Sequence, residues 1–288
     1  MVLDNSILLV NTNRMMPPIA PVGLEYVAEA MVRSGYAVEL ADLGVADDPE
    51  TELRERLSRS RPILIGLSFR NVDDCFWPSA RSFLPQLEAQ ISAVRQWSDA
   101  PIVVGGVGFS IFAEAIVRRT GVEFGVLGDG EVSLPALLSA VKGSTRLEEV
   151  PGLIWRQGDR LRINSPAWPD EIRVPTSRAL IDNATYFRRG GQVGIETKRG
   201  CDRACIYCAD RLAKGTRSRL RPPADVADEV ESLLGQGVDV LHLCDAEFNI
   251  PGRHAIDVCD ELIRRKLGGR VRWYAYLAVV PFDDELAG

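Results

Sequence analysis

Short apolar runs alternate with longer helical patterns through the first half of the chain. Strands are expected at Ser6–Val10, Val38–Leu43, Ile63–Phe69, Ile102–Val104 and Phe124–Leu127. Helices are expected over residues 24–31, 49–58, 79–97, 110–119 and 131–141. Strands separated by helices cannot pair through tight turns, so they form a parallel sheet with helices on both faces. We therefore predict an α/β, flavodoxin- or Rossmann-like, doubly wound domain over residues 1–145.

The region that follows is predicted to be a linker over residues 146–190. Gly152–Trp155 and Arg160–Ile163 flank Gly158-Asp159, a pattern typical of a β-hairpin. A second α/β unit is expected over residues 191–288. Its strands are predicted at residues 193–197, 238–244 and 271–277, and its helices at 224–234, 252–265 and 282–287. Three strand–helix units cannot close a barrel, so we expect a fragment or half of an assembly.

Charge and hydropathy exclude several classes of partner. The chain has 34 Lys and Arg against 40 Asp and Glu, a net charge of −6, which argues against general affinity for nucleic acid or anionic membranes. No run approaches the ~18 apolar residues that span a bilayer, and the N-terminus lacks a signal-peptide pattern. We expect a cytoplasmic protein with neither nucleic acid nor membrane among its partners.

Three of the six cysteines lie within eight residues, as Cys201-x3-Cys205-x2-Cys208, directly after a predicted strand. Three thiolates on one loop suit three corners of a cubane iron–sulfur cluster and leave the fourth iron open. A zinc site is the alternative, with Cys244 or His242 as the fourth ligand. A purely structural set of core cysteines is a further alternative. Cys75 and Cys259 are predicted to be buried small hydrophobic residues.

This cysteine loop resembles that of the radical S-adenosylmethionine (SAM) superfamily. The resemblance implies a [4Fe-4S] cluster on Cys201, Cys205 and Cys208, with SAM at the open iron. It also implies the first part of a radical SAM (β/α) partial TIM barrel. Tyr207 occupies the position that packs against adenine. Asp245 and Glu247 occupy the position that binds the methionine amino group; alternatively, they form an acidic turn that caps the next helix.

The N-terminal half resembles the cobalamin-binding domain that often precedes a radical SAM barrel. The resemblance rests on Pro17-Pro18 with Pro21–Leu24, and on segments that follow predicted strands: Ile65–Ser68, Val104–Gly106 and Gly128–Glu131. It implies that the strand-end loops bind cobalamin. The residues implied are Ser68, Arg70, Asn71, Gly105, Gly106, Gly128, Gly130 and Glu131. Methylthiotransferases need three N-terminal cysteines for a second cluster, whereas this half has only Cys75, so that interpretation fails.

Histidine is absent from the first 241 residues. A cobalamin bound there would lack a histidine ligand, and the resemblance implies the base-off form. We place Arg70 and Asn71 near the lower face of the corrin, where a guanidinium, having no lone pair to donate, would block coordination. Alternatively, Arg70 pairs with Asp73 or Asp74 at the surface.

A basic stretch runs from Arg188 to Pro223, with ten Lys and Arg and three acidic residues. One hypothesis is a docking face for an acidic electron donor such as flavodoxin or ferredoxin. The same charges could steady the anionic ends of SAM and cobalamin. The alternative is an ordinary solvated loop and helix face.

Together the two resemblances imply a cobalamin-dependent radical SAM enzyme, and most directly a methyltransferase. A methyl group would pass from SAM through methylcobalamin to an unactivated carbon of a small-molecule or natural-product substrate. The alternatives are a cobalamin-containing radical SAM enzyme that cyclises or rearranges its substrate, and a non-catalytic cobalamin- and cluster-binding module. The substrate itself is not readable from the sequence.

Overall fold

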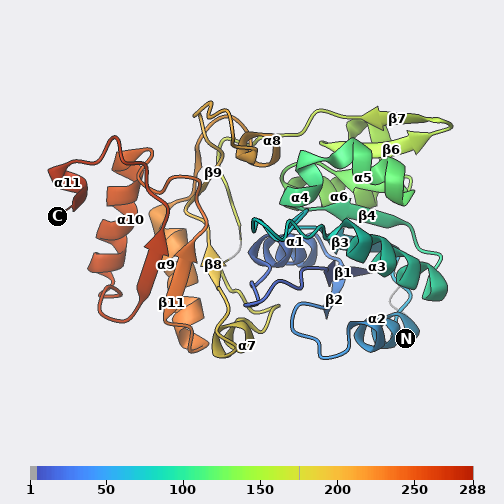
Figure 1. The fold of residues 1–288 in the computed structure, drawn as a ribbon, viewed down its shortest axis with the longest axis horizontal. Coiled ribbons are helices and arrows are strands. Elements are labelled where there is room, and N and C mark those ends of the chain that lie inside the picture. Colours follow the sequence, from blue (N-terminus) through green and yellow to red (C-terminus); the bar gives the residue numbers. More distant parts are fainter. Residues whose placement is uncertain (1–4, 175, 288) are drawn as a thin grey trace. The chain divides into compact units, whose positions relative to one another are not determined.

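The structure is a computed structural model that describes residues 5–174 and 176–287. The chain divides into two compact units (Figure 1). The first comprises the residues up to Met15 together with Gly23–Trp168, and the second comprises Met16–Val22 together with the residues from Pro169 onward. Among the helices that the structure describes, none is long and apolar enough to cross a membrane.

A seven-stranded sheet forms the centre of the first unit, in the order β2-β1-β3-β4-β5-β6-β7. Its strands are β1 (Ser6–Asn11), β2 (Ala37–Asp42), β3 (Leu64–Ser68), β4 (Ile102–Gly105), β5 (Phe124–Val126), β6 (Leu153–Gln157) and β7 (Arg160–Ile163). The strands from β1 to β5 pair in parallel. The order 2-1-3-4-5 is that of flavodoxin-like folds, which confirms the predicted α/β class and places a topological switch point between β1 and β3.

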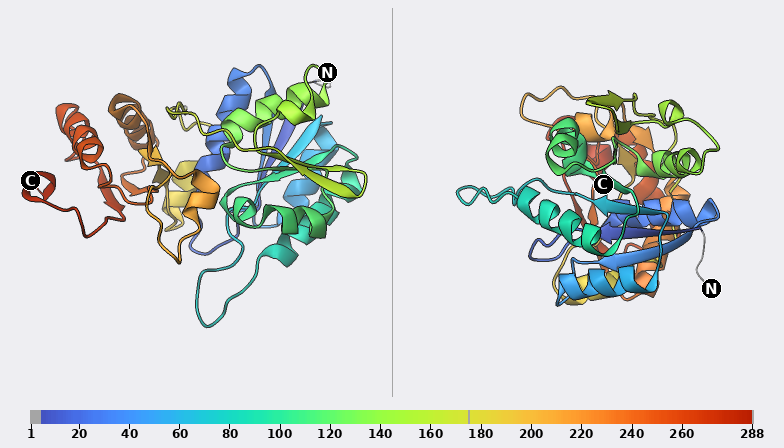
Figure 2. Two further views of the ribbon diagram at one scale, coloured as in Figure 1. Left: turned by 90° about the horizontal axis from the view of Figure 1, so that it is seen from above. Right: turned by 90° about the vertical axis from the view of Figure 1, so that its right-hand side faces the viewer.

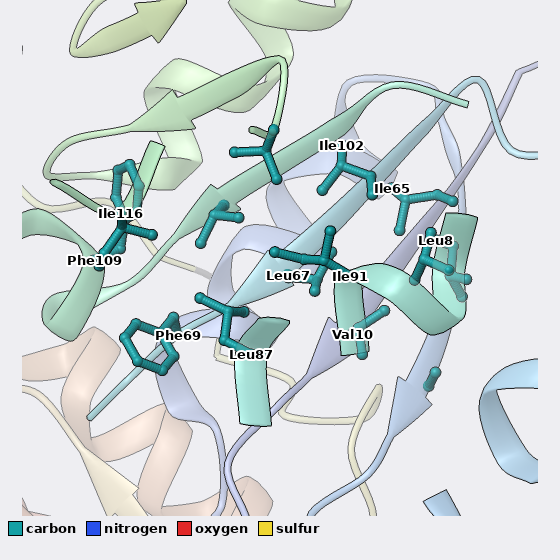
Figure 3. Close-up of a cluster of buried hydrophobic side chains, with 14 of the residues drawn as sticks. Leu8, Val10, Ile65, Leu67, Phe69, Leu87, Ile91, Ile102, Phe109 and Ile116 are labelled. Carbon is teal, nitrogen blue, oxygen red and sulfur yellow. The ribbon is translucent and has the colours of Figure 1, made fainter. Parts of the chain in front are cut away.

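The helices of this unit are α1 (Val22–Arg33), α2 (Pro49–Arg59), α3 (Leu84–Trp97), α4 (Val107–Ile111), α5 (Ala113–Thr120) and α6 (Gly130–Val141), with a 3-10 turn at Leu147–Glu149. One face of the sheet packs against α2 to α5 through a single apolar cluster (Figure 3). Leu8, Val10, Ile65 and Leu67 contribute from the strands, and Leu87, Ile91 and Ile116 from the helices. Alternate strand residues supply this cluster because successive side chains point to opposite faces.

Two predicted helices differ from those observed. The helix expected at 110–119 begins at Val107 and is interrupted at Phe112, which separates α4 from α5. The helix expected at 79–97 begins only at Leu84. The residues before it, 70–83, form a long loop (Figure 2), in which the Trp77 side chain is 86% exposed.

Cys75 lies in this loop and is exposed, so the prediction that it is buried is wrong. The turn around it is held by carboxylates: Asp73 accepts from the Cys75 N–H at 2.9 Å, and Asp74 accepts from the Ser79 hydroxyl at 2.6 Å. Side-chain oxygens that satisfy backbone donors compete with helix formation, which explains why the helix starts later than its periodicity indicates.

The β6–β7 hairpin extends the N-terminal sheet. β6 pairs antiparallel with β5, and β7 pairs antiparallel with β6. These residues are predicted to be a linker, whereas in the structure Ile154 belongs to the apolar cluster of the first unit. Pairing covers the outer edge of β5, which would otherwise present unpaired backbone groups.

The second unit contains a three-stranded parallel sheet in the order β12-β11-β8 and a two-stranded ribbon, β10-β9. Its strands are β8 (Gly194–Ile195), β9 (Lys198–Arg199), β10 (Arg219–Leu220), β11 (Val240–Leu243) and β12 (Arg272–Ala275). Its helices are α7 (Asn183–Arg188), α8 (Asp210–Lys214), α9 (Pro223–Gly235), α10 (Gly252–Arg264) and α11 (Asp284–Ala287). Side chains of α9 and α10 pack on one face of the larger sheet, as in a (β/α) barrel.

A buried ionic network lies between α9 and β8. Glu229 of α9 accepts from Arg178 at 2.7 Å and from Arg221 at 2.5 Å, and all three side chains are fully buried. The two arginines also reach the backbone, where Arg178 donates to the Gly194 carbonyl at 2.8 Å and Arg221 donates to the Glu196 carbonyl at 2.5 Å. The network therefore joins α9 to the first residue of β8 and to the residue directly after it.

Replacement of Glu229 by Ala should destabilise the second unit by about 3–5 kcal/mol, because it leaves two buried guanidinium groups without their counter-charge. Denaturant unfolding followed by circular dichroism measures this effect. Glu231→Gln on the same helix changes a half-exposed side chain and should shift the unfolding free energy by at most about 0.5 kcal/mol. Equal unfolding midpoints for the two variants would contradict the assigned role of Glu229.

Candidate functional site

The cysteine loop connects β9 to α8 in the second unit. Residues 201–209 have no regular secondary structure, and Cys201 anchors the start of the loop by donating its N–H to the Gly215 carbonyl at 3.3 Å. Cys205 and Cys208 are exposed and Cys201 is partly buried, all three as free thiols. Tyr207 lies between them with its ring 88% exposed.

The three thiols do not converge on one point in this structure. Among the residues that the structure describes, no three His, Cys, Asp or Glu side chains gather as in a metal-ion site. The donor set nevertheless suits an iron–sulfur cluster, because three free thiols stand on one irregular, accessible loop. Cys244 and His242, the alternative fourth zinc ligands, instead contact each other on β11, with Sγ 3.6 Å from Nδ1.

Asp245 lies at the carboxyl end of β11 and is buried. Its carboxylate accepts from the Thr197 N–H at 2.9 Å, the Thr197 hydroxyl at 2.5 Å and the Lys198 N–H at 3.2 Å. Burial raises the pKa of Asp245, although these hydrogen bonds oppose the shift. Asp245 therefore holds the backbone that leads into the cysteine loop, whereas Glu247 remains partly exposed.

The acidic turn does not cap the next helix. The residue before the first turn of α10 is Pro251, and no side chain caps that end of the helix. The alternative interpretation of Asp245 and Glu247 as a helix cap is therefore wrong.

Buried charges lie beneath the cysteine loop. Glu196 accepts from Arg199 at 2.6 Å and lies 3.7 Å from the Lys214 ammonium. Burial alone would raise the pKa of Glu196, but the charges of Arg199 and Lys214 lower it below its usual value. Burial lowers the pKa of Lys198, while the charges of Asp245 and Cys201 oppose the change.

The basic stretch is therefore only partly a surface. Its buried members are Lys198, Arg199, Arg219 and Arg221. Its exposed members are Arg188, Arg189, Arg203 and Arg217. Arg199 and Arg221 are buried against the carboxylates of Glu196 and Glu229, and Arg219 donates to the Lys214 carbonyl.

A second candidate site lies at the carboxyl edge of the N-terminal sheet. The ends of β1, β3 and β4 are bound together: the Thr12 hydroxyl donates to the Ser68 carbonyl at 2.7 Å, and the Phe69 N–H donates to the Gly105 carbonyl at 2.7 Å. The Gly108 N–H donates to the Arg70 carbonyl at 2.9 Å. These bonds fix Ser68 and Arg70 at the switch point, where ligands bind in open α/β sheets.

Arg70 and Asn71 are both partly buried and contact each other, since Arg70 donates to the Asn71 side-chain oxygen at 2.6 Å. The alternative partners, Asp73 and Asp74, accept instead from the Cys75 N–H and from the Ser79 hydroxyl. Within the described residues, Arg70 therefore pairs with Asn71 in the loop after β3 and not with Asp73 or Asp74 at the surface.

The glycines at this edge permit close contacts within the protein. At Gly106, with φ of +104°, an added Cβ would lie 2.7 Å from the Phe69 carbonyl oxygen. At Gly128 it would lie 2.8 Å from the Trp168 ring, and at Gly130 it would lie 2.8 Å from Val27. Only at Gly105 is the nearest atom at an ordinary distance, 3.7 Å. Glu131 lies in the first turn of α6.

The polar residues at the end of β1 are not among the predicted site residues, although their loop lies at the same edge of the sheet. Asn11 donates to Asp42 at 2.8 Å, and the Thr12 carbonyl accepts from Gln86 at 3.0 Å and from Gln90 at 3.4 Å. Two polar residues directly after an apolar strand, Asn11-Thr12, were the available signal.

The chain was compared with known proteins and solved structures. Residues 10–138 match the family of B12 binding domains. The whole chain aligns at 31% identity with 58% of a tryptophan 2-C-methyltransferase of Streptomyces laurentii. An anaerobic magnesium-protoporphyrin IX monomethyl ester cyclase of Cereibacter sphaeroides is 26% identical over 88% of this chain and 42% of its own length. The chain thus spans about half the length of these curated relatives.

The fold matches a solved radical SAM methyltransferase, TsrM from Kitasatospora setae. At 36% identity and a TM-score of 0.90, the match covers 99% of this chain and 58% of the structure solved with cobalamin and a [4Fe-4S] cluster. The same enzyme was also solved with its tryptophan substrate and a SAM analogue. By sequence and by fold, this chain is similar to cobalamin-dependent radical SAM enzymes.

Proposed function

We propose that the protein is a cobalamin-dependent radical SAM methyltransferase that moves a methyl group from SAM to a carbon of an aromatic small molecule such as tryptophan. The observation that carries this proposal is the cysteine loop directly after β8 and β9, in a chain whose N-terminal part matches a B12 binding domain. The methyltransferases at 31% and 36% identity support it. We assign cobalamin binding to residues 1–145 and radical SAM chemistry to residues 191–288.

Cys201, Cys205 and Cys208 are the proposed ligands of a [4Fe-4S] cluster, because their loop offers three free thiols. We propose that Tyr207 and Glu247 contact SAM, since both are accessible. Asp245, the other expected SAM contact, would act indirectly, because its carboxylate holds the backbone of Thr197 and Lys198 in place. When bound, the cluster would supply electrons and SAM the methyl group.

Cobalamin would bind at the carboxyl edge of the N-terminal sheet, near Ser68, Arg70, Asn71 and Gly105. We propose the base-off form without a histidine ligand, because histidine is absent from the first 241 residues. The Arg70–Asn71 pair would occupy the lower face, and a guanidinium cannot coordinate cobalt. Gly106, Gly128, Gly130 and Glu131 would shape this edge through their packing within the protein and at the start of α6.

An electron donor such as flavodoxin or ferredoxin is the proposed protein partner. The exposed arginines of the basic stretch, among them Arg203 in the cysteine loop itself, would attract its acidic surface. A cyclase without methyl transfer is the second candidate, favoured by the cyclase relative at 26% identity. A methylated product together with S-adenosylhomocysteine would distinguish methyl transfer from cyclisation.

Anaerobic reconstitution with iron, sulfide and hydroxocobalamin should load about four irons per chain, as expected for one cubane cluster. Cys205→Ala should lose most of this iron because it removes one of three ligands, and iron analysis measures the loss. Cys75→Ala, another exposed cysteine, is the matched control and should keep its iron. Zinc in place of iron would contradict the proposal.

Substitution of Arg70 by His should change the absorbance of bound cobalamin, because an imidazole can coordinate cobalt where a guanidinium cannot. The ultraviolet–visible spectrum of the reconstituted protein measures this change. Arg81→His introduces the same group at an exposed position near the far end of the same loop and should leave the spectrum unchanged. An unaltered spectrum for Arg70→His would show that Arg70 does not lie at the lower face.

A further inference from the structure

The two faces of the larger sheet in the second unit carry different side chains. Ile195, Leu241 and Trp273 point toward α9 and α10, where they line one apolar cluster. Because side chains alternate along a strand, His242 and Tyr274 point to the opposite face. These two residues are direct neighbours across the β11–β12 pair.

Three aromatic rings gather on that face. His242 and Tyr274 stack with ring centroids 4.7 Å apart and planes inclined by 11°. Tyr276 meets His242 edge-on, with centroids 5.6 Å apart and an interplanar angle of 84°. Tyr274 is 43% exposed and Tyr276 is 67% exposed, so both rings are accessible. We name the pair Tyr274 and Tyr276 the tyrosine corner.

Cys244 contacts both His242, which stacks on Tyr274, and the helix that follows the cysteine loop. The Cys244 thiol lies 3.6 Å from His242 Nδ1, and its carbonyl accepts from Lys214 of α8, the helix after the loop, at 3.1 Å. Across the sheet, β8 places Gly194 beside Cys244, and a Cβ at Gly194 would come within 2.4 Å of the Cys244 sulfur. Glycine at this position therefore lets Cys244 and His242 lie against β8.

We propose that the tyrosine corner binds the planar aromatic ring of the substrate, with Tyr274 as the stacking surface and Tyr276 as the edge. Aromatic rings prefer offset-stacked and edge-on partners, and the corner presents both arrangements at once. Burial raises the pKa of Tyr274, so its hydroxyl remains a neutral donor at physiological pH. The inference rests on the proposed function, because it assigns specificity-determining residues to that reaction.

Binding of L-tryptophan to the reconstituted protein, measured by isothermal titration calorimetry, tests this assignment. Tyr274→Leu and Tyr276→Leu should each raise the Kd roughly two- to twelve-fold, the contribution of one aromatic pair. Tyr274→Phe keeps the ring and should restore binding. Trp97→Leu alters a similarly exposed aromatic residue on α3 and should leave the Kd unchanged. L-Phenylalanine should bind more tightly than 3-cyclohexyl-L-alanine, which has the same bulk without aromatic character.

Unchanged affinity in both leucine variants would overturn the assignment, as would equal affinity for L-phenylalanine and its cyclohexyl analogue. Iron and cobalt are measured on the same samples, so the two proposals can fail separately. A wild-type protein that carries both metals but does not bind L-tryptophan would refute the tyrosine corner alone. Tyrosine-dependent binding in protein that loads neither metal would refute the proposed function and keep the corner as an aromatic-binding site.

Discussion

The second unit is built around the buried carboxylate of Glu229. A carboxylate without solvent is tolerated only when its charge and lone pairs are satisfied, and Arg178 and Arg221 do both. Because the same arginines bind the carbonyls of Gly194 and Glu196, the network sets the path of the chain just before the cysteine loop. The irregular loop can therefore be accessible while its base is rigid.

In both units, the candidate residues lie at the carboxyl edge of a parallel sheet. Each builds a parallel sheet and places polar and glycine-containing loops at the carboxyl ends of the strands. In the first unit, hydrogen bonds tie Ser68 to Thr12, Gly105 to Phe69 and Arg70 to Gly108. In the second, the Asp245 carboxylate performs this task by binding Thr197 and Lys198. The candidate residues of both units thereby lie on loops whose ends are fixed by a sheet.

The tyrosine corner arises from the alternation of side chains along β11 and β12. Residues of β8, β11 and β12 that face α9 and α10 are apolar and form the core. The residues between them are Gly194, His242 and Tyr274, which leave the opposite face polar and aromatic. Because successive side chains point to opposite faces, one face of the sheet packs into the core and the other is left for contact with a ligand.

The sequence by itself determined the alternating strands and helices, the three-cysteine loop and the absence of N-terminal histidine. Each of these depends on local spacing or on composition, which the chain carries without folding. Tertiary structure alone decided that the hairpin joins the sheet, that Cys75 is exposed and that Asp245 turns inward to Thr197. It also decided that Gly106 and Gly128 accommodate protein atoms, and that Tyr274 stacks on His242. Apart from the exposure of Cys75, which rests on the local turn at Asp73 and Asp74, these outcomes depend on partners tens of residues away, so no local pattern contains them.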